Sequence, residues 1–199
     1  MGMKRIFDLV VSVFLIILSL PLWIIIPLSI RLDSKGGVFY KSRRMGRNER
    51  LFAVYKFRTM KPNHDTSGIT VGPKDPRITP VGAVLRKWKL DELPQLFNLI
   101  SGEMALVGPR PDVPGYNQVY KKYNPNHFGM KPGLTSPASI YFMRESEIYE
   151  GLDDPRQHYI NQVIPTKVEL DRVLLHHNLK DDMLVIMKTL SNLIKNSFR

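Results

Sequence analysis

The chain of 199 residues contains no cysteine. Disulfides and thiolate metal sites are therefore excluded, and a cytosol-facing location is allowed. Acidic residues are also in deficit, since 18 Asp and Glu stand against 29 Lys and Arg, which gives a net charge of +11. Such an excess of positive charge requires an anionic partner, which could be nucleic acid, an anionic membrane or a phosphate-bearing substrate.

Several common catalytic motifs are also missing. The sequence has no G-x-x-x-x-G-K-[ST] phosphate-binding loop, no G-x-G-x-x-G dinucleotide motif and no G-x-S-x-G nucleophile motif. Its five histidines lack the spacing of a zinc site. The adjacent His176 and His177 are expected at the surface near a helix end.

One long apolar run is present at residues 6–30, and its only charge is Asp8. As a straight helix it would extend roughly 37 Å, enough to cross a bilayer core of about 30 Å. A cleaved signal peptide is disfavoured by the length and by the lack of a small-residue cleavage site. A single-pass anchor remains an alternative. A nucleic-acid binder needs no such run, so nucleic acid is not expected as a partner.

Basic residues flank both ends of this run, as Lys4, Arg5, Arg31, Lys35, Lys41, Arg43, Arg44 and Arg47. Positive residues stay on the cytoplasmic side, so both ends are expected on that side. Pro21 should kink the helix near its middle, and Pro27 adds a second weak point. We therefore predict a re-entrant membrane hairpin over residues 1–33, with Ser19 as a partner for the backbone groups freed at the break.

The remaining residues, 34–199, predict a compact cytosol-facing catalytic domain, so that the whole fold is mixed α/β and mostly helical. The patterns favour the following elements: a loop or short hairpin at 34–50, a strand at 51–60, an irregular loop at 61–80, helices at 81–89, 93–100 and 167–176 with a break at Asp91, a short strand within 102–111, a turn at 131–133, and short helices with loops over 112–160.

The last stretch, 181–199, places apolar residues at helical spacing on one face, namely Met183, Ile186, Met187, Leu190, Leu193 and Ile194. Such a face is typical of an ordinary core helix. It is equally typical of an amphipathic helix lying at the membrane interface.

The stretch from Val84 to Asn98 holds the richest set of reactive groups. Asp91 and Glu92 stand side by side before a predicted helix, where Asp91 would be the N-cap and Glu92 would favour the positive helix end. Arg86, Lys87 and Lys89 precede them and suit phosphate. A carboxylate beside cations stays ionised, as a nucleophile or a magnesium ligand requires.

Further cations complete the predicted phosphate site. Arg110 stands between Pro109 and Pro111, so its guanidinium is presented with little freedom to lose. Lys56 and Arg58 alternate on the predicted strand, so they would share one face and widen the basic surface.

Together these pieces resemble the monotopic phosphoglycosyl transferases, also called bacterial sugar transferases. Four motifs occur in the family's order along nearly the whole chain: YKFRTM at 55–60, LDELPQLFN at 90–98, VGPRP at 107–111 and KPGLT at 131–135. The resemblance implies a re-entrant membrane helix and an α/β domain on the cytosolic face of the inner membrane, with helices along the membrane.

The resemblance also implies the reaction. Asp91 would attack the phosphorus of a UDP-sugar that bears the sugar, and UMP would leave. Undecaprenyl phosphate would then take the phospho-sugar, which gives a polyprenyl-diphosphate-linked sugar in the first membrane step of glycoconjugate synthesis. The implied cofactor is Mg²⁺, with Asp91 and Glu92 as its ligands, and Glu92 could instead manage a proton.

Other site residues follow from the same resemblance. Arg86 and Arg110 would hold phosphates, Lys56 would support them, and Asp171 matches an acidic residue on a late helix. The chain departs from the family pattern at Leu20, at Ser42 and in the stretch 136–139. No particular sugar, pathway or oligomeric state is therefore predicted. A membrane-tethered binder of anionic lipids without catalysis is the rival interpretation.

Overall fold

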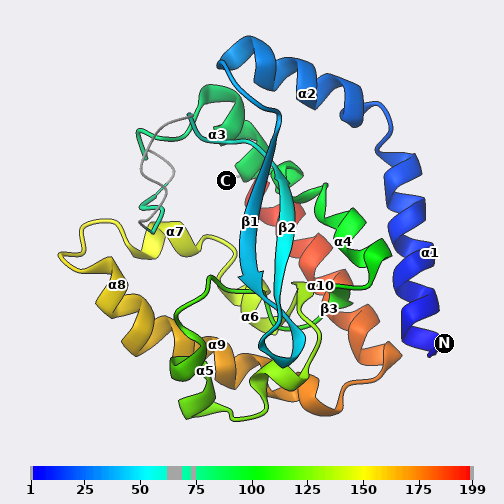
Figure 1. Ribbon diagram of the computed structural model, residues 1–199, viewed down its shortest axis with the longest axis vertical. Coiled ribbons are helices and arrows are strands. Elements are labelled where there is room, and N and C mark those ends of the chain that lie inside the picture. The colour runs from blue at the N-terminus through cyan, green and yellow to red at the C-terminus, as the bar shows by residue number, and fades with distance from the viewer. Residues whose placement is uncertain (1, 62–68, 73–74, 198–199) are drawn as a thin grey trace.

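The computed structural model describes residues 2–61, 69–72 and 75–197 (Figure 1). Its elements, with η for 3-10 and π turns, are α1 Met3–Leu18, α2 Leu22–Asp33, β1 Phe39–Met45, η1 Arg47–Glu49, β2 Leu51–Phe57, α3 Pro80–Lys87, η2 Leu90–Glu92, α4 Gln95–Ser101, β3 Ala105–Val107, α5 Asn117–Tyr123, η3 His127–Gly129, β4 Gly133–Thr135, α6 Pro137–Tyr141, α7 Glu145–Ile148, α8 Pro155–His158, η4 Tyr159–Val163, α9 Ile164–Asp171, η5 Arg172–His176 and α10 Leu179–Ser197. The expected mixed α/β, mostly helical fold is confirmed.

The apolar run forms the helix pair α1 and α2, bent by 63°. Pro21 precedes the first residue of α2, and Ser19 follows the last turn of α1. The Ser19 hydroxyl lies 2.7 Å from the Leu15 carbonyl and 3.2 Å from the Ile16 carbonyl, and it accepts from the Trp23 indole at 3.0 Å. The Leu20 N–H donates to Ile17 and leaves the Ile16 carbonyl without its helical partner, so Ser19 is confirmed as a partner at the break. Pro27, expected as a second weak point, lies inside α2 and does not break the helix.

Neither helix of this pair has the length and apolar composition of a membrane span by itself, and neither does any other single helix in the described part of the chain. Taken together, α1 and α2 do reach that length and composition.

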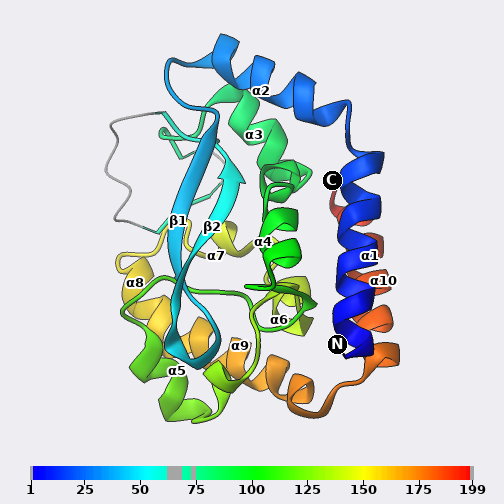
Figure 2. The same cartoon turned by 45° about the vertical axis from the view of Figure 1, so that its right-hand side comes forward.

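Two charged side chains of α1 bind α4 and β3, and α1 lies alongside α4 (Figure 2). The Arg5 guanidinium donates to the Leu99 and Ile100 carbonyls at the end of α4. The buried Asp8 carboxylate accepts from the Leu106 backbone N–H at 3.2 Å. The one charge within the apolar run therefore makes a specific contact with β3.

A long hairpin of β1 and β2 forms one of two small sheets, and Phe39 pairs with Phe57 in its antiparallel register. The alternative of a hairpin within 34–50 is thus partly confirmed. The strand expected to reach Met60 ends at Phe57, and Met60 forms only an isolated bridge with Ile78. Of the loop expected at 61–80, residues 62–68 and 73–74 lie outside the described residues.

The segment with the Asp-Glu pair is two helices joined by a tight 3-10 turn. Thr79 caps α3 by accepting from the Gly82 N–H at 3.0 Å. Lys89 then adopts a left-handed conformation, with φ of 55°, and starts η2. The predicted helix break is confirmed, but Asp91 as a helix N-cap is wrong, because Asp91 lies inside η2 and Pro94 is the N-cap of α4.

The second sheet is a short parallel pair of β3 and β4. It brings the Gly108 and Gly133 backbones so close that a Cβ on Gly133 would lie 2.1 Å from the Gly108 nitrogen. The turn expected at residues 131–133 is wrong, because this segment leads as extended chain into β4. Only glycine permits this approach, which fixes the loop that carries Arg110.

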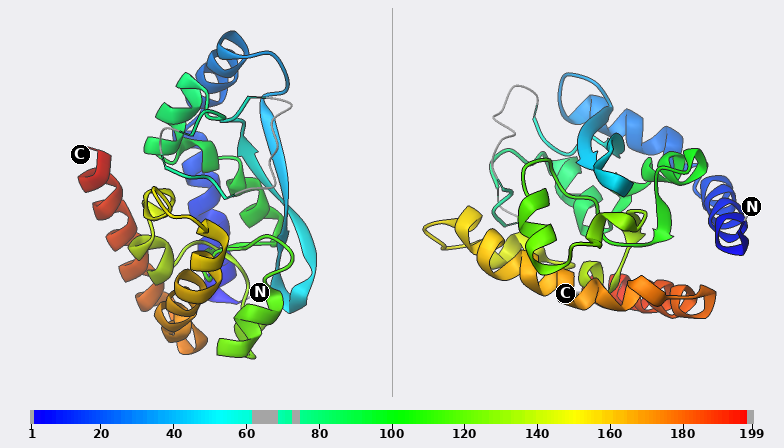
Figure 3. Two further views of the ribbon diagram at one scale, coloured as in Figure 1. Left: turned by 90° about the vertical axis from the view of Figure 1, so that its left-hand side faces the viewer. Right: turned by 60° about the horizontal axis from the view of Figure 1, so that its bottom comes forward.

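The C-terminal helix α10 follows α9 along one edge of the molecule (Figure 3). The start of α10 is tied to α1, because Lys4 of α1 pairs with the buried Asp182. His177 pairs with the same carboxylate, so only His176 of the two adjacent histidines is exposed. Five apolar side chains of α10 are half exposed or more, namely Met183 (50%), Leu184 (57%), Met187 (65%), Leu190 (55%) and Ile194 (61%). The alternative of a core helix is therefore wrong.

Candidate active site

A cavity of about 1340 Å³ lies between α1, α10 and η2. One part of its wall is charged and includes Lys56, Arg86, Asp91, Glu92 and Arg110. Another part is apolar and comes from the two helices, with Val11, Phe14, Leu18, Ile186 and Leu190. The structure therefore brings five of the predicted site residues together beside an apolar surface.

Glu92 is the centre of the charged part. Its carboxylate lies 2.9 Å from the Lys56 ammonium and makes a two-pronged contact with Arg110, with one N–H donating to Oε2 at 3.1 Å. Burial raises the pKa of Glu92, but Arg110 and Lys56 outweigh burial and hold this pKa well below its ordinary value. Glu92 is thus a permanent anion that fixes two cations.

The neighbouring Asp91 is in a different environment. It is 6% exposed, its Oδ2 lies 4.0 Å from the Lys56 ammonium, and its Oδ1 has no hydrogen-bond partner among the described residues. Burial raises the pKa of Asp91, and Lys56 opposes this rise. A buried oxygen without a partner costs stability, so this arrangement points to an interaction with a ligand. Two adjacent carboxylates in different environments can take different chemical roles.

Arg86 lines the same cavity, and its Nε donates to the Thr59 hydroxyl at 2.9 Å. Burial lowers the pKa of Arg86 while Asp91 raises it, so the two charges interact. The hydrogen bond to Thr59 thus holds the Arg86 guanidinium at the charged part of the cavity.

The structure does not bring Arg58 into this cluster. Its guanidinium donates to the Ser34 carbonyl at 2.8 Å and the Lys35 carbonyl at 2.9 Å, just after α2. Alternate residues share a face only while a strand lasts, and β2 ends at Phe57, before Arg58. Arg58 therefore fixes the exit from the bent helix pair.

Asp171 does line the cavity, but its carboxylate has a structural contact. Oδ1 accepts from the Ala138 N–H at 2.8 Å, at the start of α6. Asp171 is 2% exposed, and burial raises its pKa to about 6. The side chain thus holds α6 against α9.

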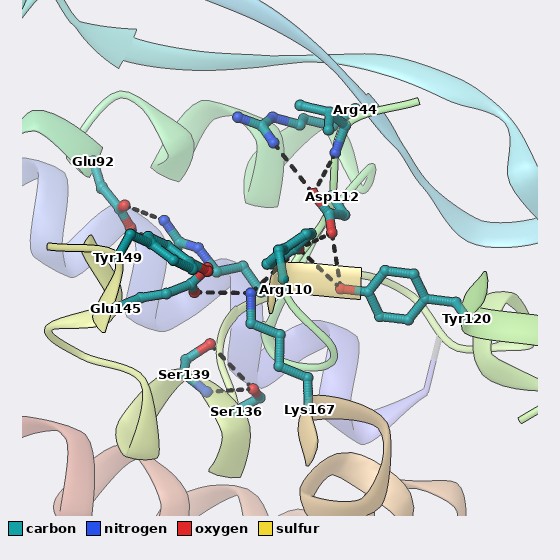
Figure 4. Close-up of polar contacts among 12 residues, drawn as sticks. Arg44, Glu92, Arg110, Asp112, Tyr120, Ser136, Ser139, Glu145, Tyr149 and Lys167 are labelled. Atoms are coloured by element: carbon teal, nitrogen blue, oxygen red, sulfur yellow. Dashed lines mark hydrogen bonds and ion pairs between the residues drawn. The ribbon is translucent and has the colours of Figure 1, made fainter. Parts of the chain in front are cut away.

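Sequence reasoning did not identify a second charged pair on the cavity wall, Glu145 and Lys167 (Figure 4). The Lys167 ammonium lies 2.8 Å from Glu145 Oε2. Glu145 begins the short helix α7 and belongs to no recognisable motif, and Lys167 stands 22 positions later on α9. Only the fold brings these two side chains together. The one nearby indication in the sequence was that residues 136–139 differ from the family pattern.

The oxygen atoms of this site fit a magnesium ion. Among residues 2–61, 69–72 and 75–197, no three side chains of Asp, Glu, His or Cys gather as a metal cluster. Mg²⁺ at phosphate-transfer sites is usually held by one or two carboxylates and the substrate phosphates. The unpartnered Oδ1 of Asp91, with Glu92 beside it, meets that requirement.

Known proteins resemble the chain over most of its length. The sequence profile of the family described as bacterial sugar transferase matches residues 1–196. The exopolysaccharide production protein PSS of Rhizobium leguminosarum bv. phaseoli is 39% identical over 71% of this chain and 75% of its own length. The undecaprenyl-phosphate glucose phosphotransferase of Komagataeibacter xylinus is 40% identical over 69% of this chain and 27% of its own length. The uncharacterized sugar transferase EpsL of Bacillus subtilis is 37% identical over 70% of this chain and 69% of its own length.

Proposed function

Because the chain belongs to the bacterial sugar transferase family, we propose that it transfers a phospho-sugar from a UDP-sugar to undecaprenyl phosphate. UMP is released and the product is a polyprenyl-diphosphate-linked sugar, which initiates polysaccharide synthesis. The observation that carries this proposal is Asp91, with a free buried oxygen, next to a Glu92 that fixes Lys56 and Arg110.

The geometry supports a two-step transfer. In the first step Asp91 attacks the phosphorus that bears the sugar, a new P–O bond forms, and the P–O bond to UMP breaks. In the second step a phosphate oxygen of the lipid attacks the same phosphorus and releases Asp91. Lys56, Arg86 and Arg110 are positioned to neutralise the phosphate oxygens in both steps.

Asp91 and Glu92 would hold Mg²⁺ together with the donor diphosphate. Bound there, the ion would neutralise charge on the phosphates and on the departing UMP. In the described structure both oxygens of Glu92 are engaged by cations, so Asp91 has the oxygen that is free for a ligand.

The apolar part of the cavity fits the lipid acceptor. Phe14 and Leu18 of α1 and Leu190 of α10 line the same cavity as Asp91. An amphiphile with a phosphate head and an isoprenoid tail matches a site that is cationic in one part and apolar in another. We infer that the tail lies between α1 and α10.

This arrangement suits the cytosolic face of the inner membrane. The bent pair of α1 and α2 would enter one leaflet and return, and the exposed apolar face of α10 would lie at the interface. Basic residues near the surface add about 1 kcal/mol each of attraction to anionic lipid. The active site then meets a lipid phosphate at the headgroup level and a nucleotide sugar from the cytosol.

The test is UMP release by purified protein with Mg²⁺ and a panel of UDP-sugars, first without lipid. UDP-glucose is the first donor to try, because the Komagataeibacter xylinus relative is named for glucose. We expect about one UMP per active site, a mass gain of one phospho-sugar, and ping-pong kinetics once undecaprenyl phosphate is added. UMP release only after lipid addition would show direct attack by the lipid phosphate. Lipid binding without UMP release from any donor would favour the non-catalytic tether.

A further inference from the structure

The ion pair of Glu145 and Lys167 stands on the cavity wall beside Arg110 (Figure 4). Glu145 is close enough to raise the pKa of the Arg110 guanidinium, after the larger effect of Glu92. Because Arg110, Glu145 and Lys167 line one cavity, a donor whose phosphate is held by Arg110 would extend its attached group along the same wall. The pair is itself neutral overall, so it does not compete with Arg110 for the phosphate.

Protein groups hold both side chains in one orientation. The Tyr149 hydroxyl donates to Glu145 Oε1 at 2.7 Å. Lys167 lies 4.8 Å from the ring centre of Tyr159 and 5.8 Å from that of Phe142. Its ammonium also donates to the Tyr159 hydroxyl at 3.4 Å. Such support is typical of a recognition site whose groups are ordered before the ligand binds.

The same network connects the pair to the phosphate clamp. The Tyr159 hydroxyl donates to Asp112, which also accepts from Tyr120 at 2.8 Å. Asp112 follows Arg110 by two residues, so the loop that carries the guanidinium is fixed relative to Lys167. One connected hydrogen-bond network thus holds Lys167 in a fixed position relative to Arg110.

Stability alone does not explain this pair. Its side chains are 28% and 12% exposed, for Glu145 and Lys167 respectively. A largely buried ion pair often contributes no more to stability than apolar residues of the same volume. A carboxylate and an ammonium on a cavity wall can, however, bind hydroxyl groups, because the carboxylate accepts hydrogen bonds and the ammonium donates them.

We propose that Glu145 and Lys167 recognise vicinal hydroxyl groups of the UDP-sugar, with Glu145 accepting from one hydroxyl and Lys167 donating to its neighbour. This inference rests on the proposed function and adds specificity residues to it. Two parts of the donor carry such hydroxyls, the transferred hexose and the ribose of uridine. The pair therefore selects among donors by the position and orientation of hydroxyls in one of these rings.

The test pairs variants of the protein with deoxy analogues of the donor. The donor is the member of the UDP-sugar panel that gives the fastest UMP release, and its analogues lack one hydroxyl, either on the hexose or at C2′ or C3′ of the ribose. The variants are Glu145→Gln, Lys167→Met and Lys167→Gln. Glu169→Gln is the matched control, because Glu169 on the same helix is 68% exposed, pairs with Arg172 and does not line the cavity.

We expect wild-type kcat/KM to fall about 10- to 100-fold for one deoxy position, as for a hydrogen bond to a charged group. The same deletion should cost Glu145→Gln or Lys167→Met less than about threefold, because the partner is already gone. If the variant and the deoxy analogue have non-additive effects only at a hexose position, the pair binds the hexose. If they do so only at a ribose position, the pair binds the ribose. The control should behave as wild type.

A merely structural role predicts a different pattern. If each variant loses activity by the same factor with every donor and every deoxy analogue, the inference is wrong. Melting temperature in detergent reports misfolding separately, and the milder Lys167→Gln serves if the Met variant does not fold. A wild type that releases no UMP from any donor would overturn the proposed function itself, so the two failures are distinguishable.

Discussion

Replacing Asp171 with Asn separates the charge of this side chain from its hydrogen bond. The Asp171 carboxyl is 2% exposed and accepts from the Ala138 N–H at 2.8 Å. An Asn oxygen can accept the same bond, but the amide does not ionise. The substitution therefore removes the buried charge and leaves the support of α6 in place.

The magnitude follows from the pKa of Asp171, which burial raises from 3.8 to about 6. The difference of about 2 units corresponds to about 3 kcal/mol. Between about pH 4 and pH 6 the folded protein holds a proton that the unfolded chain has lost, so the free energy of unfolding falls as pH rises through this window. Above the window, Asp171→Asn should be more stable than the wild type by up to about 3 kcal/mol, and below it the two should converge.

The assay is unfolding in detergent micelles from pH 4 to pH 8, followed by circular dichroism, with UMP release measured in parallel. Asp171→Asn should keep most of its activity, whereas Asp171→Ala should lose both stability and activity because α6 loses its anchor. Parallel stability curves for Asn and wild type at every pH would refute the buried-charge reasoning. A stable Asn variant as inactive as the Ala variant would show that the carboxylate charge itself is needed in the reaction.

Four further predictions concern the chemistry and the membrane. Asp91→Asn should lose both the phospho-sugar adduct and turnover while still inserting into the membrane, because the Asp91 side chain makes no cap; an intact adduct by mass spectrometry would assign the nucleophile elsewhere. EDTA should abolish UMP release and Mg²⁺ should restore it, so full activity in excess chelator would remove the metal from the mechanism. Single cysteines at Gly2 and Gly37, where the structure leaves room for a side chain, should both be labelled only from the cytoplasmic side, and periplasmic labelling of the first would indicate a spanning helix. Pro21→Leu together with Pro27→Leu should straighten the segment and shift some molecules towards spanning.

The charged centre could be predicted from sequence because its residues lie in short motifs with strong local chemistry. Asp91 and Glu92 are adjacent, and Arg110 is held between two prolines, so the local sequence is enough to single them out as candidates. The break between α1 and α2 was equally local, since a proline without an N–H and a nearby Ser19 hydroxyl determine it. The apolar run and the net positive charge led to the prediction of a membrane segment and of an anionic partner.

Other features depended on contacts between distant segments. Arg58 was expected in the site because strand periodicity places it beside Lys56, but β2 ends one residue earlier and Arg58 binds carbonyls after α2. The turn expected at residues 131–133 became the entry to β4, because Gly108 allows a backbone approach that no local pattern reveals.

The sequence by itself determined the adjacent Asp91 and Glu92, the basic residues just before them and the bent apolar segment, because each follows from neighbours within a few residues. Only the tertiary structure decided that the apolar face of α10 is left uncovered, that Asp171 supports α6, and that Glu145 meets Lys167 beside Arg110. Those outcomes depend on which surfaces pack together, and packing is the sum of many weak contacts between segments far apart in the chain.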